Sequence, residues 1–186
     1  TAFGIEAICQ LLKIKGQVLP VTLNDVELIA KLNDGTDLVS ETRIDLRTNF
    51  EKKIEYIYLS RRAQIYKPVI EAIHQADYII IGPGSLYTSI LPNFLVEGLS
   101  EALLQTQAPK IYIVNLVTDP SETHKYKASD FIQKLQEYYE SETLLDYEVM
   151  YTVLCLNLLP PTTPVVMVVF QRPRYTALSA YSVFLE

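Results

Sequence analysis

The chain has 186 residues, enough for one domain with a hydrophobic core, whereas two full domains would be tight. Its 16 basic and 22 acidic residues give a formal net charge of −6, and basic residues cluster only in pairs such as Lys52-Lys53, which argues against nucleic acid as a partner. No apolar run approaches the ~18 residues of a membrane-spanning helix, and the widely separated Cys9 and Cys155 are typical of reduced thiols, so we expect a cytoplasmic protein with no membrane partner.

Hydrophobic alternation predicts a β-hairpin in the first third of the chain. Between residues 26 and 32, apolar side chains alternate with mostly polar ones, which is typical of a strand with one buried face. The turn sequence Asn-Asp-Gly-Thr follows at residues 33–36, and Leu38-Val39 begins the return strand. A further alternation at Ile54, Tyr56 and Tyr58 predicts another strand.

Two buried strands are predicted in the middle of the chain. Residues 68–76 form the preceding helix, because Pro68 suits a first helical turn and apolar residues follow at helical spacing. The runs 78–81 and 111–114 are short and apolar, as expected for strands covered on both faces. An amphipathic helix between them, marked from Phe94 to Leu103, makes the two strands a parallel pair.

A polar loop follows each of these strands. In the first loop, Gly82 and Gly84 permit backbone angles that other residues avoid, and several hydroxyls lie beside free N–H groups, so a phosphate or carboxylate could be held without a cation. A tight turn whose hydroxyls only cap the next helix is an equal alternative. The second loop, residues 118–124, precedes a helix that begins near Ser129. Because both loops leave the carboxyl ends of neighbouring strands, we expect them to face one pocket.

The last part of the chain is β-rich and less easily assigned. Residues 147–157 are interpreted as one more buried strand. After the proline-rich segment 160–164, residues 165–170 form another β-rich run. This run is interpreted as an edge strand, a divergent terminus or a segment with no native partner, and the three alternatives stay open.

The segment from Gly82 to Val96 resembles the hallmark segment of the 2-phospho-L-lactate transferase (CofD-like) superfamily, in the form found in its gluconeogenesis-factor branch. Segments 16–22, 72–77 and 115–123 support the resemblance, which covers roughly residues 3–140. It implies an α/β, Rossmann-like three-layer domain with a mainly parallel sheet and a β-hairpin, incomplete at the N-terminus. We assign residues 1–150 to this partial domain and expect 151–186 to be a strand-rich segment of the same domain.

The resemblance to the regulator branch implies a protein that binds a UDP-sugar and regulates carbon metabolism and cell shape or envelope growth. The ligand is then a nucleotide sugar or another small phosphodiester. One alternative is a 2-phospho-L-lactate transferase-like enzyme acting on a deazaflavin acceptor, for which Mg²⁺ is considered. Another is a truncated fragment that binds no ligand. No catalytic residue or metal ligand is assigned, and a homo-oligomer is left open.

The ligand contacts are predicted on the two loops and the segment that follows the first. They are Gly82, Gly84, Ser85, Tyr87, Thr88, Ser89, Asn93, Asn115, Thr118, Glu122 and Thr123. Two nearby residues depart from the family pattern, since Asp119 replaces a common glutamine and Ser121 a common glycine. We expect Asp119 to add negative charge near a phosphate, and Ser121 to be strained if its turn requires positive φ.

Overall fold

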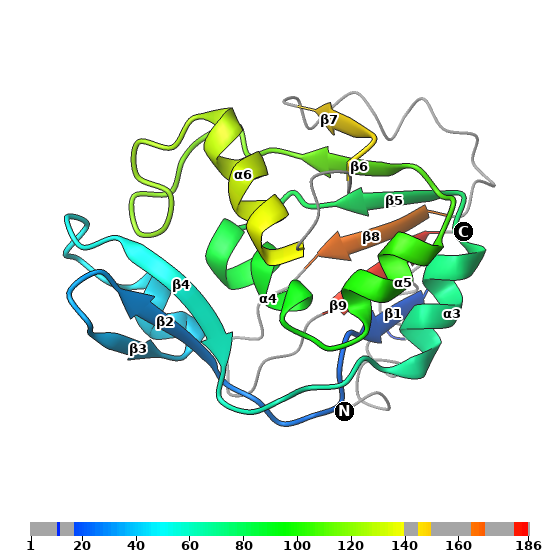
Figure 1. The fold of residues 1–186 in the computed structure, drawn as a ribbon, viewed down its shortest axis with the longest axis horizontal. Coiled ribbons are helices and arrows are strands. Elements are labelled where there is room, and N and C mark those ends of the chain that lie inside the picture. The colour runs from blue at the N-terminus through cyan, green and yellow to red at the C-terminus, as the bar shows by residue number, and fades with distance from the viewer. Residues whose placement is uncertain (1–10, 12–16, 140–144, 150–164, 170–180, 186) are drawn as a thin grey trace.

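The computed structural model describes residues 11, 17–139, 145–149, 165–169 and 181–185. These residues form a mixed α/β fold with two separate sheets (Figure 1). The predicted fold class is therefore confirmed. Both cysteines and the end of the predicted strand 147–157 lie outside the described residues.

The larger sheet has six strands in the order β1-β9-β8-β5-β6-β7. Strands β8, β5, β6 and β7 run parallel, whereas β9 is antiparallel to its neighbours β8 and β1. The predicted parallel pair is thus confirmed at β5 and β6. The strands are β1 Gln17–Pro20, β5 Tyr78–Ile81, β6 Lys110–Ile113, β7 Tyr147–Val149, β8 Val165–Val169 and β9 Tyr181–Leu185.

Strand β8 corrects the interpretation of the last part of the chain. It lies inside the larger sheet between β5 and β9. The interpretations of residues 165–170 as an edge strand or as a segment without a partner are therefore wrong. Its backbone pairs Ile79 with Val166 and Ile81 with Val168. An uninterrupted run of apolar residues is typical of such an interior strand.

The smaller sheet contains three antiparallel strands in the order β3-β2-β4, with β2 Leu28–Leu32, β3 Asp37–Val39 and β4 Ile54–Leu59. Its hairpin is confirmed, and Gly35 supplies the turn with a φ of 84°. A register shift at Lys31/Leu32 changes which side of β4 faces the core. Ile54 and Ile57 are buried, while Tyr56 is 46% exposed, so the simple alternation of this strand is wrong.

The helices on one face of the larger sheet include α3 Lys67–Gln75, α5 Leu99–Gln105 and α6 Ala128–Tyr139 (Figure 1). The helix predicted at 68–76 is confirmed as α3. The prediction of one continuous helix from Phe94 to Leu103 is wrong. The chain forms a π-helical turn, Leu86–Ile90, followed by α4, Leu91–Phe94, and α5 begins separately at Leu99. Gly98 causes the break, since its φ of 99° is left-handed and incompatible with a continuing α-helix.

A single hydrophobic cluster joins the helices to both sheets. Residues from β2, β4, β5, the π-helical turn and α6 all belong to it. In the described part of the chain, no helix combines the length and apolar character needed to cross a bilayer. The parallel strands point towards the side of the molecule where the smaller sheet lies, which places the loops after β5 and β6 beside that sheet (Figure 1).

Candidate functional site

The loop after β5 depends on two glycines for different reasons. Gly82 has a φ of 79°, and a Cβ there would lie 3.0 Å from the carbonyl oxygen of Ile113. Gly84 does not have positive φ, but a Cβ there would meet the Cβ of Ser89 at 3.2 Å. The unusual backbone angle is thus found at Gly82, while Gly84 leaves room for the turn that follows.

Polar groups after the glycines point into the protein. Tyr87, Thr88 and Ser89 are buried, and the Tyr87 hydroxyl shares a 2.8 Å hydrogen bond with that of Tyr126. Asn93 is also buried, and its Nδ2 donates to the carbonyl oxygens of Ser89 and Ile90 at 3.0 and 3.1 Å. These side chains hold the π-helical turn together, so any role for them in ligand contact stays a prediction.

The loops after β5 and β6 contact each other directly. Asn115 bridges them, because its Nδ2 donates to the Gly84 carbonyl at 2.7 Å and its Oδ1 accepts the Gly84 N–H at 3.3 Å. The two loops therefore lie together at one edge of the sheet, as parallel strands require. That they face one pocket is not borne out, because no residue of 82–89 lines the cleft described below. In addition, the Gly84 amide that was predicted to face an anion has an internal acceptor.

Glu122 makes the second link between the loops. One carboxylate oxygen accepts the Tyr87 N–H at 2.9 Å, and the other accepts the Thr88 hydroxyl at 2.5 Å. The residue is only 4% exposed. The Glu122 carboxylate thus accepts hydrogen bonds from the first loop, whose N–H and hydroxyl groups were predicted to hold a negatively charged ligand.

The turn before Glu122 is organised by Asp119. Its Oδ1 accepts the N–H and the hydroxyl of Ser121 at 2.7 and 2.6 Å, and its own N–H donates to Thr123 Oγ1 at 2.9 Å. Ser121 does not have positive φ, so the expected strain is wrong. Thr123 is buried in this turn, and Thr118 is half-buried at its start.

Burial and neighbouring carboxylates make Glu122 unusually hard to ionise. Burial is the main cause that raises its pKa to about 7, and the charges of Asp45 and Asp119 act in the same direction. The hydrogen bonds from Thr88 and Tyr87 oppose the shift without cancelling it. Glu122 therefore changes its charge near neutral pH.

A cleft of about 1120 Å³ opens next to Glu122, between the smaller sheet and α6. One wall comes from residues 47–54 and the other from the loop 122–126 and α6. Among the predicted site residues, only Glu122 lines this cleft. The charged side chains that line it are Arg47, Glu51, Lys53, Glu122, Lys125, Asp130, Lys134 and Glu137.

Sequence reasoning missed the cationic residues of this cleft. Arg47 follows the short helix α2, Glu41–Asp45. Its guanidinium donates to the backbone carbonyls of Ser121 and Lys52, which joins the cleft wall formed by residues 47–54 to the second loop. Lys53 and Lys125 form no ion pair with any described residue. Lys125 has a φ of 64°, a strained conformation for a side chain of its kind. No sequence motif marks these positions, because the fold brings them together.

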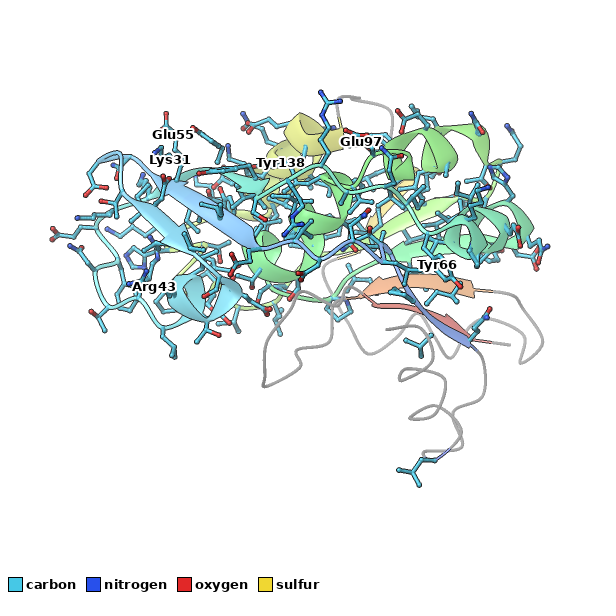
Figure 2. All side chains as sticks on the ribbon, turned by 90° about the horizontal axis from the view of Figure 1, so that it is seen from below. Lys31, Arg43, Glu55, Tyr66, Glu97 and Tyr138 are labelled. Atoms are coloured by element: carbon cyan, nitrogen blue, oxygen red, sulfur yellow. The ribbon has the colours of Figure 1, made fainter. Side chains whose placement is uncertain are left out.

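Tyr138 joins the main body to the smaller sheet beside this cleft. Its hydroxyl accepts the N–H of Ile57 in β4 at 2.7 Å (Figure 2). No set of three or more His, Cys, Asp or Glu residues in the described ranges is arranged to hold a metal ion. Magnesium therefore stays a prediction attached to the transferase alternative.

The sequence pattern of one protein family, described as 2-phospho-L-lactate transferase CofD, matches residues 1–160. The chain belongs to the CofD family. This confirms the resemblance found at residues 82–96, which includes both loop glycines and the π-helical turn.

Relatives named gluconeogenesis factor are also similar to this chain. A gluconeogenesis factor from Halalkalibacterium halodurans is 41% identical over 140 residues, covering 74% of this chain and 42% of the relative. The gluconeogenesis factor of Listeria monocytogenes is 38% identical over 136 residues, covering 73% of this chain and 41% of the relative. The chain thus spans less than half the length of either relative, and it is similar to the gluconeogenesis-factor branch.

A solved structure has the same fold. The crystal structure of a UPF0052 family protein from Bacillus halodurans matches with a TM-score of 0.71 and 38% identity, covering 79% of this chain and 47% of that one. A TM-score of 0.71 over 79% of this chain shows that most of the chain shares the fold of that crystal structure.

Proposed function

We propose that this chain binds a sugar nucleotide of the UDP-sugar type in the cleft beside Glu122. In this proposal it is a cytoplasmic regulatory protein of the gluconeogenesis factor type, acting in carbon metabolism and in cell-shape or envelope growth. The observation that carries the proposal is the cleft of about 1120 Å³ whose opposite walls present Lys53 and Lys125, neither paired with another described residue.

The chemistry of the cleft suits the parts of such a ligand. Free ammonium groups attract a diphosphate, and they need no rearrangement of existing ion pairs to do so. Carboxylate and amide side chains, such as those of Asp130, Asn49 and Gln133, can hydrogen-bond sugar hydroxyls. Phe50 supplies an aromatic surface at the same cleft. The cleft, at about 1120 Å³, is slightly larger than the ~300–1,000 Å³ that is typical of small-molecule sites.

Isothermal titration with UDP-glucose tests the proposal. Lys53→Gln and Lys125→Gln should each weaken binding roughly 10- to 100-fold, the effect of losing one charge-assisted contact of about 1.5–3 kcal/mol. Lys67→Gln is the matched control, because Lys67 lies in α3, away from this cleft. Absence of UDP-glucose binding, or equal loss in all three variants, would contradict the proposal.

A transferase remains the second candidate, because the matching family is described as 2-phospho-L-lactate transferase CofD. This function requires a donor with a phospholactyl group in phosphodiester linkage and a deazaflavin acceptor carrying a free hydroxyl. An assay with both substrates and Mg²⁺ should yield the phospholactyl-deazaflavin product if the candidate is right. Binding of UDP-glucose without turnover of these substrates would favour the regulatory function.

A further inference from the structure

The hydroxyl of Thr88 lies between two carboxyl groups. Its oxygen is 2.5 Å from Glu122 Oε1 and 3.3 Å from Asp45 Oδ1. A threonine hydroxyl has only one proton to donate, although its oxygen can also accept. Unless the one proton is shared in a weaker three-centre bond, both contacts can be hydrogen bonds only if one of the two carboxyl groups carries a proton. The geometry therefore favours one shared proton over two ionised carboxylates.

Two negative groups near Glu122 favour a bound proton, whereas the positive charge of Arg47 favours the ionised form. Asp45 approaches from α2 and Asp119 from the same loop, and both are negative. The positive group on this side is Arg47, but its Nε and Nη1 donate to backbone carbonyls, and no ion pair between it and Glu122 is found among the described residues. The titratable groups that face Glu122 or share its cleft are Asp45, Glu51, Arg47, Lys53, Tyr87, Asp119, His124, Lys125, Tyr126, Asp130, Lys134 and Glu137.

Protonation of Glu122 changes the charge balance of the cleft. With Glu122 ionised, the four cationic and four carboxylate side chains that line the cleft cancel. With Glu122 neutral, the lining carries one net positive charge. An anionic ligand therefore interacts better with the protonated form, and by linkage it must increase proton binding at this residue.

We propose that the cleft binds its anionic ligand together with one proton, which is held by Glu122 in contact with Thr88. The proton comes from solvent, and no covalent bond changes. The inference rests on the proposed function for the identity of the ligand as a phosphate-bearing molecule. It adds that binding at this site is regulated by pH around neutrality, with higher affinity at lower pH.

Calorimetric titration of the whole chain with UDP-glucose, in pairs of buffers with different ionisation enthalpies, measures the proton uptake. Because the Glu122 pKa is about 7, uptake at pH 7 should be about half a proton, and it should increase towards pH 8. Affinity should weaken by up to about fivefold between pH 7 and pH 8, because the protonated fraction of a group with a pKa of about 7 falls by about that factor. Glu122→Gln should bind without proton uptake, whereas Glu51→Gln, at an exposed residue of the same cleft, should retain it.

Two further measurements separate this inference from the proposed function. Titration of the Glu122 carboxyl carbon by NMR, without ligand, should show a midpoint near pH 7. Sulfate, an anion that does not itself titrate in this range, should raise that midpoint. If sulfate does so but UDP-glucose does not bind, the inference stands and the proposed function fails. A midpoint below pH 5, or equal proton uptake by wild type and Glu122→Gln, would overturn the inference.

Discussion

Replacing Glu122 with glutamine should change how the stability of this protein depends on pH. The folded-state pKa of Glu122 is raised from 4.5 to about 7 by burial. A carboxyl group with a raised pKa stabilises the fold fully below pH 4.5, and this contribution is lost as pH rises through 7. The difference of about 2.5 pKa units corresponds to roughly 3 kcal/mol between the two ends of this range. Glutamine stays neutral, so Glu122→Gln should not show this loss.

The assay compares slopes, because the substitution also alters hydrogen bonds at every pH. A glutamine oxygen can accept from the Tyr87 N–H while its amide donates to the Thr88 hydroxyl, and any remaining loss in these contacts does not depend on pH. Urea unfolding at pH 5, 6, 7 and 8 can be followed by far-UV circular dichroism, since the chain has no tryptophan. The free energy of unfolding of the variant, relative to wild type, should increase by up to roughly 3 kcal/mol from pH 5 to pH 8.

Parallel stability curves for wild type and Glu122→Gln would refute the reasoning. They would mean that Glu122 is ionised throughout, and that its contacts with Thr88 and Tyr87 outweigh burial. Glu51→Gln serves as the control, because this glutamate is exposed at the same cleft. Its curve should keep the slope of wild type.

Three further predictions concern single contacts within the fold. Tyr138→Phe leaves the Ile57 N–H without its acceptor, so the free energy of unfolding should fall by about 1–3 kcal/mol. Hydrogen exchange of the Ile57 amide should become faster, and an unchanged exchange rate would contradict this. Gly98→Ala places a Cβ 2.7 Å from Ile65 at a φ of 99°, so the substitution should lower the thermal midpoint of unfolding. The fall should be larger than for Gly35→Ala, whose Cβ meets no atom within 4 Å. Equal shifts would show that Ile65 moves aside freely. Asn115→Ala removes both bonds to Gly84 and should lower stability by about 1–3 kcal/mol, measured by urea unfolding; a loss below 0.5 kcal/mol would show that water replaces it.

The sequence was sufficient for elements whose pattern is local. The apolar run at β5, the proline at the start of α3 and the Asn-Asp-Gly turn each depend on a few neighbouring residues. Long-range pairing was not predictable in the same way. The place of β8 inside the sheet depends on pairing with β5, which is far away in the chain. The inward side of β4 depends on a register shift relative to β2.

The candidate site was predicted only in part for a similar reason. Sequence reasoning found the two loops and their contact, because parallel strands bring their carboxyl ends to one edge. It expected exposed hydroxyls, but burial is decided by tertiary packing, and Thr88 faces Glu122 instead of solvent. Lys53 and Lys125 reach one cleft from segments that have no common motif.

Asp119 and Ser121, the two residues of the second loop that depart from the family pattern, bind each other. Asp119 brings a carboxylate into the turn, and Ser121 supplies the hydroxyl and N–H that bond to it, so the extra charge is partly satisfied within the loop. The same Asp119 raises the pKa of Glu122. A turn with glutamine and glycine at these positions would lack this negative charge beside the buried carboxyl. Proton binding at Glu122 should therefore be stronger in this chain than in relatives that have the common residues, and substituting Asp119→Gln with Ser121→Gly should lower the midpoint of its titration.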